Sequence, residues 1–155
     1  MRGMTIAAAL VLAIGPLAVA HGQSMDAAAG NAAIKWGPVP PVLPKGAQMA
    51  VLSGDPSKAA LYVVRLKMPS GYVIPAHHHP TTENVTVLTG AFHAGMGDKT
   101  DKTKGMLFGP GGFAAIPDGM NHYAWTSAPT IVQVHGMGPF TIDYVNPAED
   151  PSKAK

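Results

Sequence analysis

The chain of 155 residues has the length of one domain, and its hydrophobic fraction of 46% is enough for a packed core. Its charge is nearly balanced, with 11 Lys and Arg against 9 Asp and Glu, and no basic cluster in it suggests nucleic-acid binding. The absence of cysteine excludes disulfides and thiolate ligands, so any metal site must use histidine and carboxylate.

The first 20 residues have the features of a secretory signal peptide. Arg2 precedes a short apolar run at 6–14, and an Ala-x-Ala sequence ends at Ala20. The alternative is a membrane anchor, but the run is shorter than the roughly 20 residues that span a bilayer, and Gly15-Pro16 interrupts it. We therefore expect cleavage after Ala20, a periplasmic or secreted protein, and no membrane attachment of the mature chain.

Residues 21–46 are expected to form an extended N-terminal arm. Their second half, at 36–44, is too rich in proline for a helix or a central strand. We expect this arm to lie over the core, with Trp36 as its anchor. The barrel itself is predicted at 47–146, followed by a flexible polar tail at 147–155.

The remaining pattern is one of short strands separated by turns rich in glycine and proline. The 18 Gly and 15 Pro leave no room for a convincing helix. The predicted strands are 47–53, 60–68, 72–79, 83–89, 91–96, 106–108, 112–116, 122–126, 130–136 and 140–145. Many short strands at regular spacing predict an all-β sandwich or barrel.

The stretch GYVIPAHHHPTTE, residues 71–83, contains three consecutive histidines. Side chains alternate along a strand, so His77 and His79 should point to one face and His78 to the other. Glu83 begins the next strand and His122 follows a later turn, so both could reach the same place. A metal site and a solvent-exposed polar turn are both compatible with the stretch by itself. A cloning tag is excluded because tags are terminal.

The wider spacing resembles the cupin family. Its first motif is matched by Gly71, His77, His79, Glu83 and Gly90 at the family's intervals. Its second motif is matched by a further set of residues in order, namely Gly111, Pro117, Gly119 and His122. The final Asn of the second motif is replaced by Thr126, a position that is not a metal ligand in the family.

This resemblance implies a cupin double-stranded β-helix, that is, a jelly-roll barrel. It also implies that one divalent transition metal is held by His77, His79, Glu83 and His122. Three imidazoles and one carboxylate suit Fe, Mn, Ni, Cu or Zn, and they leave coordination positions open. A local charge near +1 would favour an anionic or chelating small molecule. Small cupins often pair through outer strands, so a homodimer is also considered.

Several other residues are candidates for the pocket or its surroundings. Val85 and Val87 share the face of Glu83 and should give the pocket apolar walls. Gln133 and His135 face outward if Val132 and Val134 face the core, and enter the cavity in the opposite register. Outside the pocket, Tyr123 and Trp125 are expected on the outer face beneath the arm or a second subunit, and Met96, Met106, Met120 and Met137 in the core.

Two functions remain open from the sequence. The first is a metalloenzyme of the dioxygenase or decarboxylase type that acts on a small oxygenated molecule. The alternative is a non-catalytic module that binds or senses a small ligand and holds a structural metal. A storage or structural barrel without metal is disfavoured because the ligand set is complete. The catalytic residues, the metal and the substrate are not indicated.

Overall fold

This computed structural model describes residue 30 and residues 33–153. The predicted signal peptide at 1–20 and its cleavage site lie outside the described residues. No helix among the described residues is long and apolar enough to span a membrane.

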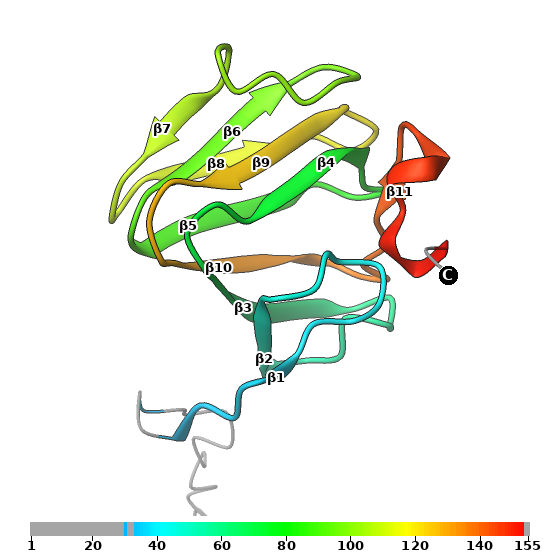
Figure 1. Ribbon diagram of the computed structural model, residues 1–155. Helices are drawn as coiled ribbons and strands as arrows, with labels where there is room; N and C mark the ends of the chain where they lie inside the picture. Colours follow the sequence, from blue (N-terminus) through cyan, green and yellow to red (C-terminus); the bar gives the residue numbers. More distant parts are fainter. Residues whose placement is uncertain (1–29, 31–32, 154–155) are drawn as a thin grey trace, which may run out of the picture.

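Two antiparallel sheets face each other and enclose the core (Figure 1). The six-stranded sheet has the order β1 (Gly37–Pro38), β2 (Gln48–Ser53), β3 (Leu61–Met68), β10 (Thr130–Met137), β5 (Glu83–Thr89) and β8 (Phe113–Ile116). The five-stranded sheet has the order β11 (Asp143–Tyr144), β4 (Val73–His78), β9 (His122–Thr126), β6 (Phe92–Met96) and β7 (Met106–Phe108). Residues 33–153 contain no α-helix, which confirms the predicted all-β jelly roll.

Alternation along the strands builds the core between the two sheets. In β10, Val132 and Val134 are buried and pair with Leu66 and Val64 of β3. Burial of each such side chain contributes about 1.5–3 kcal/mol relative to exposure. Among the described residues, the apolar inner faces of the two sheets thus pack against each other, and no α-helix covers them.

The predicted strands agree with the observed ones to within one or two residues, with one exception. The segment expected at 140–145 pairs only at Asp143–Tyr144, because Phe140 instead donates its N–H to Pro56 O at 2.7 Å. The proline-rich segment contributes the edge strand β1. The segment expected to be a flexible tail contains two short 3-10 turns, Pro147–Glu149 and Pro151–Lys153.

The glycines of the two cupin-like motifs adopt backbone conformations that favour glycine. The glycines at 71, 90, 111 and 119 all have positive φ. At Gly90 a Cβ would also lie 2.3 Å from Pro129 O, so no larger residue fits there. Thr126, which replaces the motif's Asn, is buried and ties two backbone segments together: it accepts from Tyr72 N–H at 3.1 Å and donates to Pro69 O at 2.6 Å.

Tyr123 and Trp125 lie on the outer face of the five-stranded sheet and are nearly fully buried there. The loop 97–105 contacts both residues: Tyr123 Oη donates to Asp101 O at 2.8 Å, and Gly105 packs directly on the Trp125 ring. His93 also stacks on Trp125, with ring centroids 4.7 Å apart.

Candidate metal centre

His77, His79 and His122, here called the histidine cluster, are brought together by two neighbouring strands. His77 and His79 leave the end of β4 on the same face, and His122 begins β9. The β4–β9 register places His77 directly opposite His122. Ring centroids lie 4.2 Å apart for His77 and His122, 4.9 Å for His77 and His79, and 5.2 Å for His79 and His122. All three rings are 2–3% exposed.

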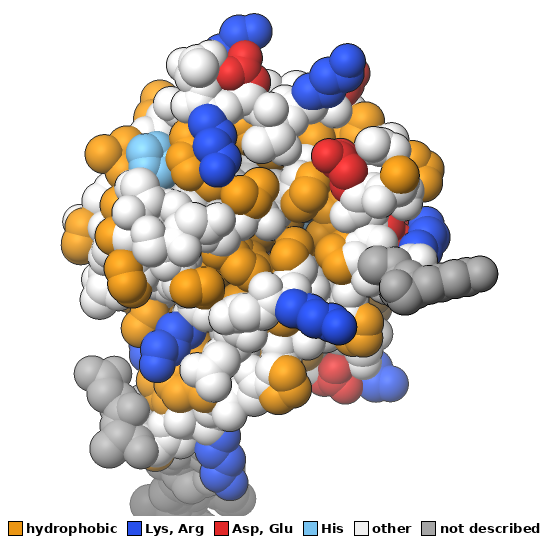
Figure 2. All heavy atoms as spheres, in the orientation of Figure 1, with side chains coloured by type: hydrophobic (Ala, Val, Ile, Leu, Met, Phe, Trp, Pro, Cys, Tyr) orange, Lys and Arg blue, Asp and Glu red, His pale blue; other side chains and the backbone are white. Residues whose placement is uncertain are grey.

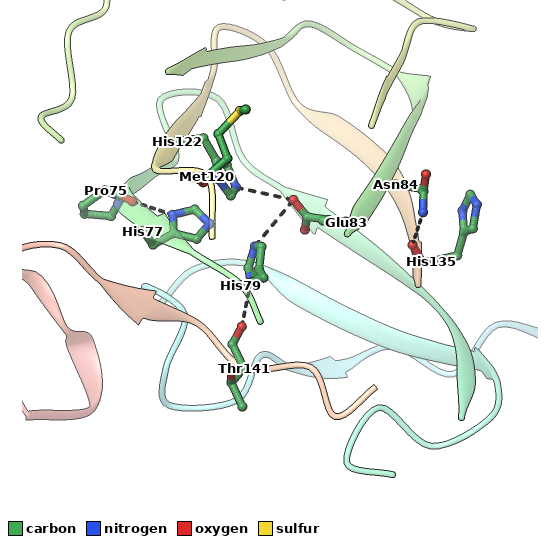
Figure 3. Close-up of polar contacts among 9 residues, drawn as sticks. All are labelled: Pro75, His77, His79, Glu83, Asn84, Met120, His122, His135 and Thr141. Carbon is green, nitrogen blue, oxygen red and sulfur yellow. Dashed lines mark hydrogen bonds and ion pairs between the residues drawn. The ribbon is translucent and has the colours of Figure 1, made fainter. Parts of the chain in front are cut away.

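Each ring of the histidine cluster is oriented by a backbone carbonyl (Figure 3). Nδ1 of His77 lies 2.6 Å from Pro75 O, Nδ1 of His79 lies 2.6 Å from Thr141 O, and Nδ1 of His122 lies 2.9 Å from Met120 O. A carbonyl oxygen only accepts, so Nδ1 carries the proton in all three rings. The Nε2 lone pairs are therefore free to bind a metal, an arrangement that metal-binding histidines commonly use.

Glu83 completes the group from the opposite sheet. Its Oε2 lies 3.6 Å from His79 Nε2 and 3.5 Å from His122 Nε2. Both nitrogens are buried and have no hydrogen-bond partner within the described part of the chain. With metal–ligand bonds of about 2.1 Å, neighbouring ligand atoms stand about 3–3.4 Å apart. The spacing is thus long for hydrogen bonds and close to that of ligands around one ion.

The charges at this site are strongly coupled. Burial by itself would raise the pKa of Glu83, but the rings of His122 and His79 beside it hold that pKa well below its usual range. Burial, followed by the rings of His122 and His79, lowers the pKa of His77 to about 3. Burial opposes charge on His79, yet the Glu83 carboxylate outweighs it and raises the pKa of His79. The carboxylate is therefore ionised and His77 neutral, as metal ligands must be.

Donor atoms from His77, His79 and His122 lie within 4.8 Å of one another, so these residues could form a metal site. The chemistry of the set, with buried unpartnered imidazole nitrogens beside an ionised carboxylate, fits a divalent transition metal. His78 alternates with His77 and His79 and belongs to the other face of β4, where it pairs in register with Asp143 of β11.

A cavity of about 330 Å³ extends from the histidine cluster towards solvent. His77, His79 and Glu83 line its inner end, and exposed Val51, Asp55 and Ser57 line its outer end. The walls between them are apolar, and part of the wall comes from the proline-rich segment, at Pro40, Val42 and Leu43. On the face drawn in Figure 2, hydrophobic side chains are frequent.

The four residues predicted as pocket candidates lie in different environments in the structure. Val85 lines a small inner cavity of about 30 Å³ together with His77, Glu83 and His122, whereas Val87 is buried in the core. Gln133 and His135, which the sequence places outside or inside according to the register of β10, do not line the cavity at the metal centre. Val132 and Val134 occupy the inner face of β10, so Gln133 turns outward and accepts from Arg65 Nε at 3.2 Å. His135 points away from the histidine cluster (Figure 3).

The methionines expected in the core are exposed. Met96, Met106, Met120 and Met137 have 54%, 65%, 40% and 53% of their surface accessible. Met96, Met106 and Met137 lie at strand ends and Met120 in a turn, where the regular packing of the sheets stops. Core filling therefore does not account for them.

Sequence reasoning missed three contributors to the site. Phe140 stacks on His79 with ring centroids 4.7 Å apart, and Thr141 supplies the carbonyl that orients the same ring. Asp55 reaches the cavity rim from the β2–β3 turn. None lies in a motif, and each meets the site only through tertiary packing.

The chain is similar to known proteins in sequence and in fold. A family model described as the ChrR cupin-like domain matches residues 24–141, well over half of the chain. Among solved structures, the chain is similar to the polyketide cyclase RemF from Streptomyces resistomycificus, with TM-score 0.66 and 20% identity over 81% of this chain and 89% of that one. No curated protein matches the chain.

Two further solved structures share the fold. One is a putative acetylacetone dioxygenase from Methylibium petroleiphilum PM1, with TM-score 0.58 and 18% identity over 76% of this chain and 79% of that one. The other is an RmlC-like cupin from Shewanella frigidimarina NCIMB 400, with TM-score 0.55 and 14% identity over 71% of this chain and 89% of that one. At these identities the likeness concerns the fold alone.

Proposed function

The chain belongs to the cupin superfamily, as a ChrR cupin-like domain, and from this premise we propose that it is a secreted or periplasmic metalloenzyme for a small oxygenated molecule. The proposed reaction is of the dioxygenase or decarboxylase type. One observation carries the proposal: three of the four candidate metal ligands, His77, His79 and Glu83, line the inner end of an apolar cavity that reaches solvent, and His122 lies beside them. A purely structural metal would not need such access.

The candidate ligands are His77, His79, Glu83 and His122. A divalent metal held there would polarise a chelating oxygenated ligand and, if it were iron or copper, could supply reactivity with dioxygen. The chain itself contributes orientation and exclusion of water. Carbonyl oxygens orient the imidazoles, and Phe140 packs against His79. Because the cavity walls are apolar, the oxygen atoms of a ligand would find polar partners at the inner end of the cavity.

The names of two neighbours are compatible with this proposal. One is a polyketide cyclase and the other a putative acetylacetone dioxygenase, and both names refer to oxygen-containing compounds. The shared fold is compatible with such chemistry, while the substrate of this chain has to be inferred from its own cavity.

The test begins with the metal content of protein purified from its native host. Oxygen uptake and substrate loss are then followed across small carboxylates, diketones and phenols. We expect turnover that His79→Ala abolishes and that His135→Ala, on the outer face, leaves unchanged. Absence of bound metal in native protein would contradict the proposal.

A non-catalytic binding or sensing role is the second candidate, and a specific observation favours it. Among the described residues that line the cavity, the titratable side chains are His77, His79, Glu83 and the rim residue Asp55. In this part of the chain, no acid or base other than Asp55 lines the cavity beside the candidate ligands. Tight binding of a small molecule without turnover would select this role.

Export and assembly are also proposals. Mass spectrometry of protein recovered from the periplasm or medium should give a mature chain that begins at His21. Light scattering of that chain tests whether it forms a homodimer.

A further inference from the structure

We propose that the outer end of the cavity is a second recognition point, where the Asp55 carboxylate binds a cationic or hydrogen-bond-donating tail of the ligand. The ligand class is then a small molecule with an oxygen-chelating head, a short apolar body and an amine-like tail. This inference rests on the proposed function, because the head is assigned to the metal centre.

The distribution of polar side chains along the cavity matches a ligand with three chemically different parts. Polar side chains occur at its two ends only, with His77, His79 and Glu83 inside and Asp55 and Ser57 at the rim. The wall between them consists of apolar side chains, including Val64, Leu66, Ile74 and Ile142. A molecule that is polar throughout would leave its central groups without hydrogen-bond partners against this wall, and each such buried group would weaken binding.

The charge of the side chains that line the cavity determines which charge is favoured on the ligand's tail. Among the described residues that line the cavity, Glu83 and Asp55 are acidic and none is lysine or arginine. Backbone and side-chain hydrogen bonds from Ser57 lower the pKa of Asp55, so it is charged at neutral pH. A second carboxylate at the ligand's far end would be repelled, and an ammonium group would be attracted.

One carboxylate oxygen of Asp55 is available to bind the tail of a ligand. Ser57 N and Ser57 Oγ both donate to Oδ1, at 2.9 Å and 2.7 Å. Oδ2 has no hydrogen bond or ion pair with another described residue. The side chain is therefore oriented through one oxygen, and the other is free for a ligand.

The backbone holds Asp55 at a fixed position relative to the metal centre. Lys58 N–H donates to Asp55 O at 3.0 Å, which closes the turn, and Phe140 N–H donates to Pro56 O at 2.7 Å. Phe140 in turn stacks on His79. The turn at the rim and a candidate ligand thus contact the same residue, so the ligand's head and tail sites have a defined separation.

The cavity volume limits the length of the ligand. Ligand pockets commonly measure about 300–1,000 Å³, and the present value of about 330 Å³ is near the lower end. A single ring with a side chain of two or three atoms is of the appropriate size.

Three matched catechols test the proposal with protein loaded with Zn²⁺, which is redox-inert. They carry a neutral tail (4-ethylcatechol), a cationic tail (dopamine) and an anionic tail (3-(3,4-dihydroxyphenyl)propionate). Calorimetric titration at low salt should show dopamine binding about threefold tighter than 4-ethylcatechol, and the propionate about threefold weaker. Added salt should reduce both differences because the rim is exposed.

Asp55→Asn is the informative variant, because the amide oxygen can still accept from Ser57 and keep the turn closed. It should make the affinities for the three catechols equal within error. Asp101→Asn is the matched control, since Asp101 Oδ1 accepts from Thr103 N–H at 3.0 Å in a similar turn that does not line the cavity. This control should retain the wild-type order.

The outcomes separate the two proposals. Equal binding of all three catechols by the wild type, or an unchanged order in Asp55→Asn, would overturn the tail site while the metal centre stands. Failure of 4-ethylcatechol to bind zinc-loaded protein would overturn the proposed function, and the tail site with it.

Discussion

Glu83 is the only carboxylate among the candidate ligands, and the three imidazoles beside it are neutral when they bind metal. Glu83→Gln keeps the shape of the side chain and removes its charge. We predict that metal affinity falls at least about tenfold, since a carboxylate attracts a divalent ion far more strongly than an amide does. Competition with a chromophoric chelator measures the loss. Glu149→Gln, at an exposed position, serves as the control, and equal affinities in both variants would show that Glu83 is not a ligand.

Thr126 shows how one buried hydroxyl can replace a motif residue. Its side chain is 1% exposed and joins Tyr72 N–H to Pro69 O. Thr126→Val preserves the shape but leaves both backbone groups without this partner, so we predict a loss of about 1–3 kcal/mol in the free energy of unfolding. Denaturant unfolding measures it, with Thr89→Val at an exposed position as the control. A change below about 0.5 kcal/mol in Thr126→Val would refute this assignment.

The candidate ligands could be anticipated from the sequence, whereas their supporting contacts could not. His77, His79, Glu83 and His122 stand at fixed intervals in two motifs, which local alternation and turns bring to one face. The carbonyl that orients His79 belongs to Thr141, 62 positions later in the chain. No local pattern marks a residue whose only contribution is a backbone oxygen.

The orientation of β10 explains a different limit of sequence reasoning. Its sequence TIVQVHGM has apolar residues on both faces, so alternation alone leaves two registers equal. Pairing with β3 and β5 on both sides decides in favour of Val132 and Val134 inside. Strand positions were therefore predictable, but the assignment of Gln133 and His135 required the neighbouring strands.

The proline-rich segment forms one wall of the cavity and is held there by tyrosine hydroxyls. Tyr144 Oη donates to Val42 O at 2.8 Å, and Tyr72 Oη donates to Pro44 O. We predict that Tyr144→Phe speeds hydrogen exchange and proteolysis in residues 37–46 about fivefold, as expected for the loss of about 1 kcal/mol.

Tyr123→Phe is the matched control for this wall, because its hydroxyl donates to Asp101 O in the loop 97–105. It should loosen that loop and leave residues 37–46 unchanged. Equal protection of residues 37–46 in Tyr144→Phe and the wild type would show that the hydroxyl does not hold the wall.

The candidate metal centre joins the two halves of the molecule. The histidine cluster belongs to the five-stranded sheet, through β4 and β9, whereas Glu83 begins β5 of the six-stranded sheet. The chain has no cysteine, so no disulfide can perform this task. An ion bound by all four side chains would link the sheets across the core, and its binding free energy would add to the stability of the whole fold.

We therefore predict that Zn²⁺ at a hundredfold excess over its Kd stabilises the protein by about 2.7 kcal/mol, which corresponds to a rise in Tm of roughly 10 °C. His77→Ala should abolish the rise, and His135→Ala on the outer face should retain it. Hydrogen exchange locates the effect: if the ion links the sheets, it should slow exchange in β5 as well as in β4 and β9. Protection confined to β4 and β9 would mean that the histidines hold the metal without Glu83, and that the sheets depend on apolar packing alone.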